Sequence, residues 1–95
     1  MQPVRIVVTY DISSDRRRRR LARRLEGLLV RVQMSVFEGE VDQKRLQKIC
    51  SISGRTINRR TDSVRIYRLC GRCVEALEIV GCGVFVASSD DDVVV

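Results

Sequence analysis

An acidic residue beside a dense run of arginines is the feature of this sequence best suited to chemistry. Residues 4–11, with the sequence VRIVVTYD, form a β-branched apolar run that ends at Asp11. The residues at 13–15, Ser-Ser-Asp, are types that cap a helix, so we expect Asp11 at the carboxyl end of a buried strand, beside a helix N-terminus. A carboxylate in that position, facing Arg16–Arg20, indicates a hard divalent cation and a phosphodiester substrate.

The composition is that of one globular domain with a polyanionic partner. The 95 residues are 44% apolar and 32% charged, whereas disordered chains have too few apolar residues to offset the entropy lost on folding. The formal charge is +6, and removing the three acids at 90–92 leaves +9 for residues 1–89. Arginine predominates among the bases and binds phosphate at two points, which favours nucleic acid over a membrane surface. Because no apolar run reaches about 18 residues, we expect a cytoplasmic protein without a membrane span.

A helix is predicted from Asp15 to about Leu29, because leucines recur along one stripe at helical spacing. The arginines of this helix divide into two groups when they are projected at ~100° per residue. Arg17 and Arg18 extend the inward stripe, and Arg18 is expected to lean back over the strand end that carries Asp11. The other group forms an outward ridge suited to a phosphate backbone and contains Arg16, Arg19, Arg20 and Arg23.

Alternation of apolar and polar residues predicts a strand over residues 30–37. Its core face would hold Val30, Val32, Met34 and Val36, and its other face Arg31, Gln33, Ser35 and Phe37. A turn or bulge is predicted at 38–40, and a second helix after Asp42, with an inward stripe formed by Leu46, Ile49, Cys50, Ser53 and Ile57. Two further strands are predicted at 63–70 and 76–80.

Two helices on one face of a small antiparallel sheet correspond to an α+β, ferredoxin-like split βαβ fold with four to five strands. We assign residues 1–83 to this domain and 84–95 to a C-terminal tail, which either adds as a strand to a partner or frays. The sheet face without helices is expected to be apolar and covered by a second copy of the chain; it would hold Val7, Phe37, Tyr67 and Leu69. In such a homodimer two Asp11 carboxylates approach the two-fold axis.

Three short motifs, in this order, are similar to those of a known family. They are YDI at 10–12, RVQMSVFEG at 31–39 and DSVRIYRL at 62–69, together with the arginine-rich start of the first helix. Over most of residues 4–81 the chain resembles the second Cas protein of CRISPR adaptation, the small partner of the CRISPR integrase. The resemblance implies a homodimer of ferredoxin-like protomers that is a metal-dependent endonuclease on RNA or DNA. It also implies that the dimer sits between integrase dimers and holds the spacer duplex during insertion.

The resemblance further assigns site residues. The metal carboxylate of the family corresponds to Asp11 and its neighbouring tyrosine to Tyr10, with Mg²⁺ or Mn²⁺ shared across the dimer axis. Other family positions correspond to Arg18, Arg20, Arg31, Ser35 and Phe37. The candidate catalytic residues are therefore Asp11, Tyr10, Arg18, Arg31 and Phe37, and the candidate nucleic-acid-binding residues are Arg16, Arg19, Arg20 and Arg23. The implied partners are a second copy, the integrase and double-stranded DNA, with single-stranded RNA as a further ligand.

Several of these residues could instead have a purely structural role. Asp11 alone would only cap a turn, and the second Asp11 of a dimer is what favours a metal. The segment Arg16–Arg24 holds seven arginines in nine residues, a density that favours a polyanion over a solvated helix face. Tyr10 and Phe37 are types that more often pack in a core than stack on bases. Since the chain has no histidine to serve as a general base, hydrolysis is expected to be slow, metal-dependent and faster at higher pH.

Two other functions are compatible with the same fold. One is a toxin-like metal-dependent ribonuclease outside CRISPR. The other is a single-stranded RNA-binding module, which needs more exposed aromatic residues than two Phe and two Tyr provide.

The four cysteines lack the paired spacing of a zinc knuckle. Cys70 and Cys73 are separated by two residues, as in zinc and redox sites, but Cys50 and Cys82 do not form a second pair. We therefore interpret all four as small apolar filler in a reducing compartment.

Overall fold

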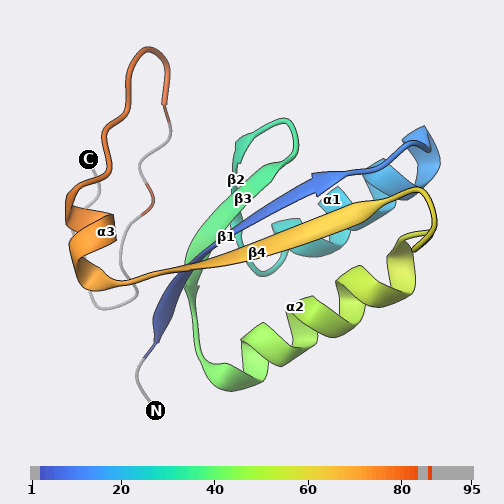
Figure 1. Ribbon diagram of the computed structural model, residues 1–95, viewed down its shortest axis with the longest axis horizontal. Helices are drawn as coiled ribbons and strands as arrows, with labels where there is room; N and C mark the ends of the chain where they lie inside the picture. The colour runs from blue at the N-terminus through green and yellow to red at the C-terminus, as the bar shows by residue number, and fades with distance from the viewer. Residues whose placement is uncertain (1–2, 84–85, 87–95) are drawn as a thin grey trace.

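One antiparallel sheet and two long helices make up most of the protein, in a computed structural model that describes residues 3–83 and 86 (Figure 1). In this part of the chain the elements are β1 (Val4–Asp11), α1 (Asp15–Glu26), β2 (Val30–Gln33), β3 (Val36–Val41), α2 (Gln43–Thr56), β4 (Ser63–Leu69) and α3 (Gly71–Glu75). The strand order is β2-β3-β1-β4, and each neighbouring pair is antiparallel. The ferredoxin-like split βαβ fold expected from the sequence is thereby confirmed, with four strands in the described residues.

The central strand β1 determines which side chains face the helices. It pairs with β3 on one side and with β4 on the other, and its residues alternate between buried and more exposed positions. Ile6, Val8 and Tyr10 are buried beneath α1 and α2, whereas Asp11 is exposed on the other face. Because side chains alternate along a strand, the position of Tyr10 fixes that of Asp11.

Both long helices begin at side-chain caps and bury one stripe. The Ser14 hydroxyl accepts a hydrogen bond from the Arg17 amide at 3.3 Å, and Asp42 Oδ1 accepts one from the Arg45 amide at 2.8 Å. Each cap thereby satisfies one of the amides that have no partner within the helix. The core that these helices close over the sheet comprises Ile6, Val8, Tyr10, Ile12, Leu21, Ala22, Leu25, Leu29, Phe37, Val41, Leu46, Ile49 and Ile52. The first helix ends at Glu26 rather than near Leu29, although Leu29 remains buried.

The strand predicted over residues 30–37 is wrong in its continuity and in its faces. It is two strands, β2 and β3, joined at Met34 and Ser35, with a register shift between Arg31 and Gln33. The two sets of alternating residues stay together but lie on the opposite faces from those expected: Arg31 and Phe37 pair on the helix side, and Val32 and Val36 line a hollow on the other side. Phe37 is 0% exposed in the core, whereas Met34, assigned to the core, is 81% exposed and Val30 is 42% exposed.

Four further expectations are corrected. Gly39 lies inside β3, paired with Ile6, and not in a turn; a Cβ there would approach Leu29 Cδ2 to 2.9 Å, so the packing favours glycine. Residues 76–80 form no strand, since the chain enters the short helix α3 and then an irregular segment. On α2, Ile52 faces the core and Cys50 is exposed. The other three cysteines are exposed too, so the interpretation of the cysteines as core filler is wrong.

The face of the sheet opposite the helices is covered at one end only. Near the start of β1, the Arg5 side chain bonds Glu38 at 3.0 Å and the carbonyl of Val86 at 3.0 Å, which leaves Arg5 only 7% exposed. Toward the Asp11 end, Tyr67 is 46% exposed and Val7 is partly exposed. The expected apolar open face is therefore present in part, but without Phe37.

Replacing the side chain of Phe37 tests the reversed facing of β3. Because Phe37 is fully buried, Phe37→Ala is expected to lower the free energy of unfolding by about 3–5 kcal/mol, measured by urea denaturation. The matched control is Met34→Ala, which should change it by less than about 0.5 kcal/mol. A larger loss for Met34→Ala than for Phe37→Ala would contradict the register of β2 and β3.

Candidate functional site

The carboxylate of Asp11 stands exposed at the end of the central strand. Asp11 is the last residue of β1 and lies opposite Ser63 of β4 in the register. Within the described residues no basic side chain forms an ion pair with it, and no group of three or more His, Cys, Asp or Glu side chains surrounds it. One chain thus offers a single oxygen donor group on an open face.

That geometry sets what a divalent cation would need at this position. Mg²⁺ keeps several waters and is typically held by one or two carboxylates together with substrate phosphates. The chemistry of Asp11 fits such an ion, and the remaining oxygen ligands have to come from a phosphodiester or from a second copy of the chain. No sequence-predicted catalytic residue adds a ligand beside it.

A buried carboxylate that sequence reasoning missed holds the loop next to Asp11 in place. The side chain of Asp62 is fully buried and bonds the Arg17 guanidinium at 2.8 Å. It also accepts hydrogen bonds from the amide of Ser13 at 3.2 Å, the amide of Asn58 at 2.9 Å and the hydroxyl of Thr61 at 2.9 Å. Asp62 therefore joins the start of α1 to the loop before β4, and these segments flank the strand end that carries Asp11.

The pKa of Asp62 reflects these bonds. The Arg17 guanidinium holds the pKa of the Asp62 carboxyl well below its ordinary value of 3.8, and the amides of Asn58 and Ser13 act in the same direction. Burial opposes this by disfavouring the charged form, but the hydrogen bonds outweigh it. Asp62 belongs to the quoted DSVRIYRL motif, yet its partners Ser13 and Arg17 are 49 and 45 positions away in sequence, so spacing alone gave no signal for its role.

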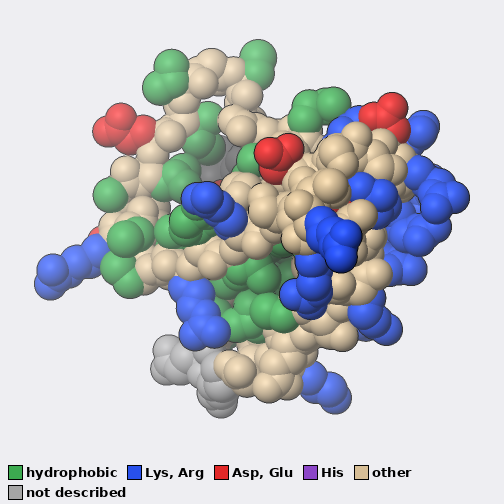
Figure 2. Space-filling view, turned by 45° about the vertical axis from the view of Figure 1, so that its right-hand side comes forward, with side chains coloured by type: hydrophobic (Ala, Val, Ile, Leu, Met, Phe, Trp, Pro, Cys, Tyr) green, Lys and Arg blue, Asp and Glu red, His purple; other side chains and the backbone are tan. Residues whose placement is uncertain are grey.

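The arginines of α1 lie where helical projection places them. Arg18 leans over the end of β1 and donates to the carbonyl of Ile12 at 2.9 Å, and it pairs with Asp15. The outward ridge is exposed, and Figure 2 shows Lys and Arg side chains gathered over the end of the molecule where α1 begins. A shallow hollow along this ridge is lined entirely by arginines, namely Arg16, Arg19, Arg20, Arg23 and Arg24.

Tyr10 and Phe37 lie on the opposite side of the sheet from Asp11. Both are buried, their ring centroids are 6.2 Å apart, and the Tyr10 hydroxyl donates to the carbonyl of Met34 at 3.2 Å. The Arg31 guanidinium lies 5.7 Å from the centroid of the Phe37 ring and bonds the same Met34 carbonyl through Nε at 3.1 Å. These three residues form one cluster that supports the β2–β3 connection. Phe37 and Arg31 therefore lie on the helix side of the sheet, and their expected position on the open face is wrong.

Arg18 and Arg31 do share a surface groove, although Asp11 does not line it. The groove has a volume of about 520 Å³ and lies between α1 and the β2–β3 connection. It also contains acids, since Arg31 pairs with Glu26 at 3.6 Å and Asp15 pairs with Arg18. The mixture of charges makes this groove less suited to a polyanion than the arginine ridge.

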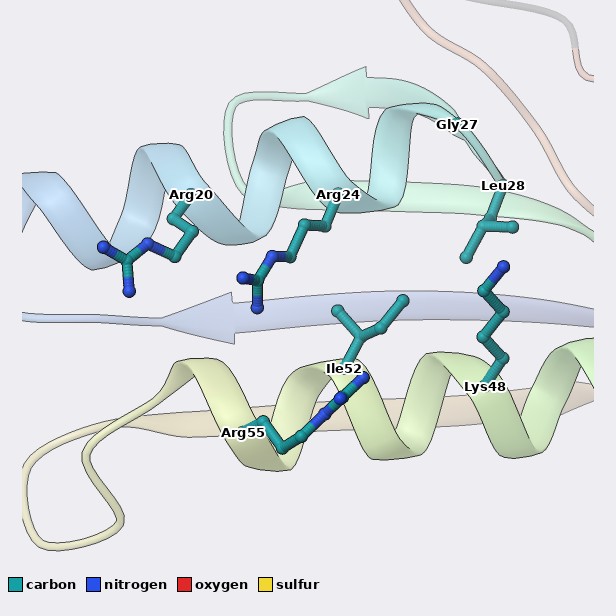
Figure 3. Close-up of a pocket in the computed structure, with 7 residues that line it drawn as sticks. All are labelled: Arg20, Arg24, Gly27, Leu28, Lys48, Ile52 and Arg55. Atoms are coloured by element: carbon teal, nitrogen blue, oxygen red, sulfur yellow. The ribbon is translucent and has the colours of Figure 1, made fainter.

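A second groove lies between the two long helices, and every charged residue that lines it is basic. Arg20 and Arg24 reach down from α1, and Lys48 and Arg55 reach up from α2, around a volume of about 620 Å³ (Figure 3). Arg24 donates to the Thr56 hydroxyl at 2.9 Å and so ties the two helices together. None of the lining residues in the described part of the chain is acidic. Sequence reasoning included Arg20 but missed Lys48 and Arg55, because they lie on a helix interpreted only as a packing element.

Most of the chain matches one known protein family. Residues 4–76 match the family model described as CRISPR associated protein Cas2. The chain belongs to the Cas2 family. The resemblance drawn from the motifs is confirmed, and the match favours a CRISPR context over the toxin-like ribonuclease.

Individual Cas2 proteins are similar to this chain in sequence and in structure. A protein from Chloroflexus aurantiacus named CRISPR-associated endoribonuclease Cas2 1 is 41% identical over 78 residues, which cover 81% of this chain and 84% of that protein. The crystal structure of Streptococcus pyogenes Cas2 superposes with a TM-score of 0.72 at 30% identity, covering 81% of this chain and 99% of that one. A hypothetical protein from Thermus thermophilus superposes with a TM-score of 0.79 at 33% identity, covering 88% of this chain and 98% of that one.

In the described residues, no helix has the length and apolar character needed to cross a bilayer.

Removing the charge of Asp62 tests whether this side chain holds the start of α1 and the loop before β4 together. Its folded-state pKa lies below 3.8, so its ionic bonds stabilise the protein fully above the unfolded-state pKa and are lost as the pH falls toward the folded-state value. We expect Asp62→Asn to lower the melting temperature at neutral pH and to flatten its fall between about pH 4 and pH 2.

The matched control for this experiment is Glu75→Gln, at an exposed carboxylate of α3 that forms no ion pair in the described residues. It should melt close to the wild-type temperature throughout this pH range. If Asp62→Asn and Glu75→Gln behave alike, Asp62 does not carry the acid dependence.

Proposed function

We propose that this Cas2 protein is a nucleic-acid-binding homodimer of CRISPR adaptation that bridges integrase subunits and holds duplex DNA, and that it cleaves phosphodiesters with Mg²⁺ or Mn²⁺. Family membership supports the CRISPR context, and relatives bear the names endoribonuclease and endonuclease. The observation that carries the binding role is the continuous basic surface of α1 and α2, with its acid-free groove between the helices.

The basic surface suits a duplex backbone better than a compact anion. The ridge and the groove share Arg20 and Arg24, so cations extend without interruption from the outer side of α1 to α2. Arginine and lysine that neutralise phosphates release counterions, which supplies affinity without base recognition. A run of such contacts is what a protein that holds DNA of any sequence requires.

The uncovered part of the sheet supports pairing with a second copy. Val7 and Tyr67 lie side by side in the register, on the same sheet face as Asp11 and four positions before it along β1, and both keep exposed apolar surface. Two copies related by a two-fold axis would bury this patch and bring their Asp11 side chains toward each other. Such a pairing supplies the second carboxylate that one chain lacks.

In the cleavage reaction, Asp11 would hold a divalent cation together with the phosphate of the substrate. The ion would neutralise phosphate charge and lower the pKa of a coordinated water. Arg18 stays close to the strand end through its bond to the Ile12 carbonyl, so its side chain is held near a phosphate bound there. Arg31 is engaged with Met34, Glu26 and the Phe37 ring, which supports a positioning role for it.

Charge reversal in the groove tests the binding role. The double variant Lys48→Glu/Arg55→Glu is expected to weaken duplex DNA binding by at least about tenfold and to reduce the slope of log affinity against log salt by about 2. The measurement is a fluorescence-anisotropy titration at several salt concentrations. Neither side chain forms an ion pair in the described residues, so the fold should be preserved.

The matched control is Lys44→Glu/Arg72→Glu, which changes the net charge equally at exposed positions outside the groove. Equal losses of affinity for the two double variants would show that only net charge matters and would contradict the groove as a contact surface.

Removing the Asp11 carboxylate separates cleavage from binding. Asp11→Ala is expected to reduce cleavage of RNA or DNA to the level seen without added metal, because the only proposed metal ligand is gone. Duplex affinity should be unchanged or slightly higher, since a negative charge has been removed. Calorimetric titration with Mn²⁺ should show one ion per two wild-type chains and none for the variant.

The control for this variant is Glu75→Gln, whose exposed carboxylate on α3 forms no ion pair in the described residues. It should retain both cleavage and Mn²⁺ binding. Cleavage by Asp11→Ala at the wild-type rate would overturn the metal assignment and leave the binding role standing.

A further inference from the structure

Two exposed thiols lie in contact at the start of α3. The Sγ atoms of Cys70 and Cys73 are 3.3 Å apart, and both residues are exposed and free. A disulfide bond needs a separation of roughly 2.0 Å, so small side-chain rotations suffice to close the pair. Cys50 lies on α2, and no contact joins Cys82 to the pair in the described residues.

The surroundings of the two thiols differ in a way that suits exchange chemistry. The backbone amide of Cys73, and then its thiol, favour the Cys70 thiolate and lower the pKa of Cys70 below the ordinary 9.0. The hydrogen bond with Cys70 raises the pKa of Cys73. An exposed thiol with thiolate character beside a second, resolving thiol is the arrangement found in reversible redox sensors.

We propose that Cys70 and Cys73 form a reversible intramolecular disulfide, with Cys70 as the attacking thiol and a small-molecule disulfide as the oxidant. The Cys70 thiolate attacks one sulfur of the oxidant, a mixed disulfide forms, and one oxidant thiolate leaves. The Cys73 thiol then loses its proton and attacks the Cys70 sulfur, which releases the second oxidant thiolate. From dithiol to disulfide the protein loses two protons and two electrons, and the oxidant takes them up to become two thiols.

The position of the pair gives the reaction a structural target. Cys70 directly follows β4, and the segment beyond it lies over the covered end of the sheet. Val74 and Leu77 line a hollow of about 490 Å³ together with Arg5 and Val86. Closing the Cys70–Cys73 bond would fix the start of α3 and with it the wall of this hollow, while leaving the basic helices and Asp11 untouched.

The test uses the full chain with Cys50→Ser and Cys82→Ser, so that only the pair remains. The protein is equilibrated in mixtures of reduced and oxidised glutathione, quenched with acid, alkylated and weighed by mass spectrometry. We expect one reversible transition from a doubly alkylated chain to an unalkylated chain that has lost two hydrogens. The disulfide should form at least about tenfold more readily in the folded protein than in urea, because the fold holds the thiols together.

Replacing Cys73 with serine in the same background removes the resolving thiol. The glutathione mixed disulfide should then form on Cys70 faster than it forms on Cys73 in the Cys70→Ser counterpart, because Cys70 is the attacking thiol. Three results would each overturn the proposal: stable mixed disulfides on both cysteines of the parent protein, linkage between chains on a non-reducing gel, or equal disulfide formation in folded and unfolded protein.

Discussion

The buried ion pair between Asp62 and Arg17 joins parts of the chain that would otherwise be independent. It connects the first turn of α1 to the loop that precedes β4, across 45 positions in sequence. The same carboxylate also bonds Ser13 and Asn58, so both segments next to the end of β1 are held by one side chain. Since breaking a buried pair leaves an uncompensated charge, the geometry around Asp11 depends on this contact being intact.

The sheet separates the two activities proposed for this Cas2 protein. Its helix side holds the core and, above it, the basic surface of α1 and α2. Its other side holds the exposed carboxylate of Asp11 and the apolar patch around Val7 and Tyr67. DNA can therefore be held on one side without occupying the carboxylate on the other, which explains why binding and cleavage are expected to separate on substitution.

The sequence was sufficient for the elements whose periodicity is regular. The spacing of leucines gave α1 and the split of its arginines, and the β-branched run gave β1 and the outward position of Asp11. It failed over residues 30–37, where the side chains alternate but their polarity does not indicate which face is buried. Valines line the more open face there, while Arg31 lies over the Phe37 ring on the helix side, so Phe37 was assigned to the wrong face. The interruption of the strand at Met34 and Ser35 was missed as well.

Contacts between distant segments could not be derived from spacing either. Asp62 lies in a polar loop, and only the folded chain reveals that four groups converge on it. Lys48 and Arg55 are ordinary surface residues of an amphipathic helix until α1 is placed beside them. The apolar residues of 76–80 favoured a strand, but after β4 the chain turns into α3 and these residues pair with no strand of the described sheet.

The crowding of arginines on α1 has a consequence for how the protein responds to its ionic environment. Neighbouring guanidinium groups repel one another, and this repulsion works against the helix that carries them. Dissolved ions weaken it over distances of about 10 Å at moderate concentration. The same ions compete for phosphates in the proposed complex with duplex DNA. A rise in ionic strength is therefore expected to stabilise α1 in the free protein and to weaken the proposed DNA binding.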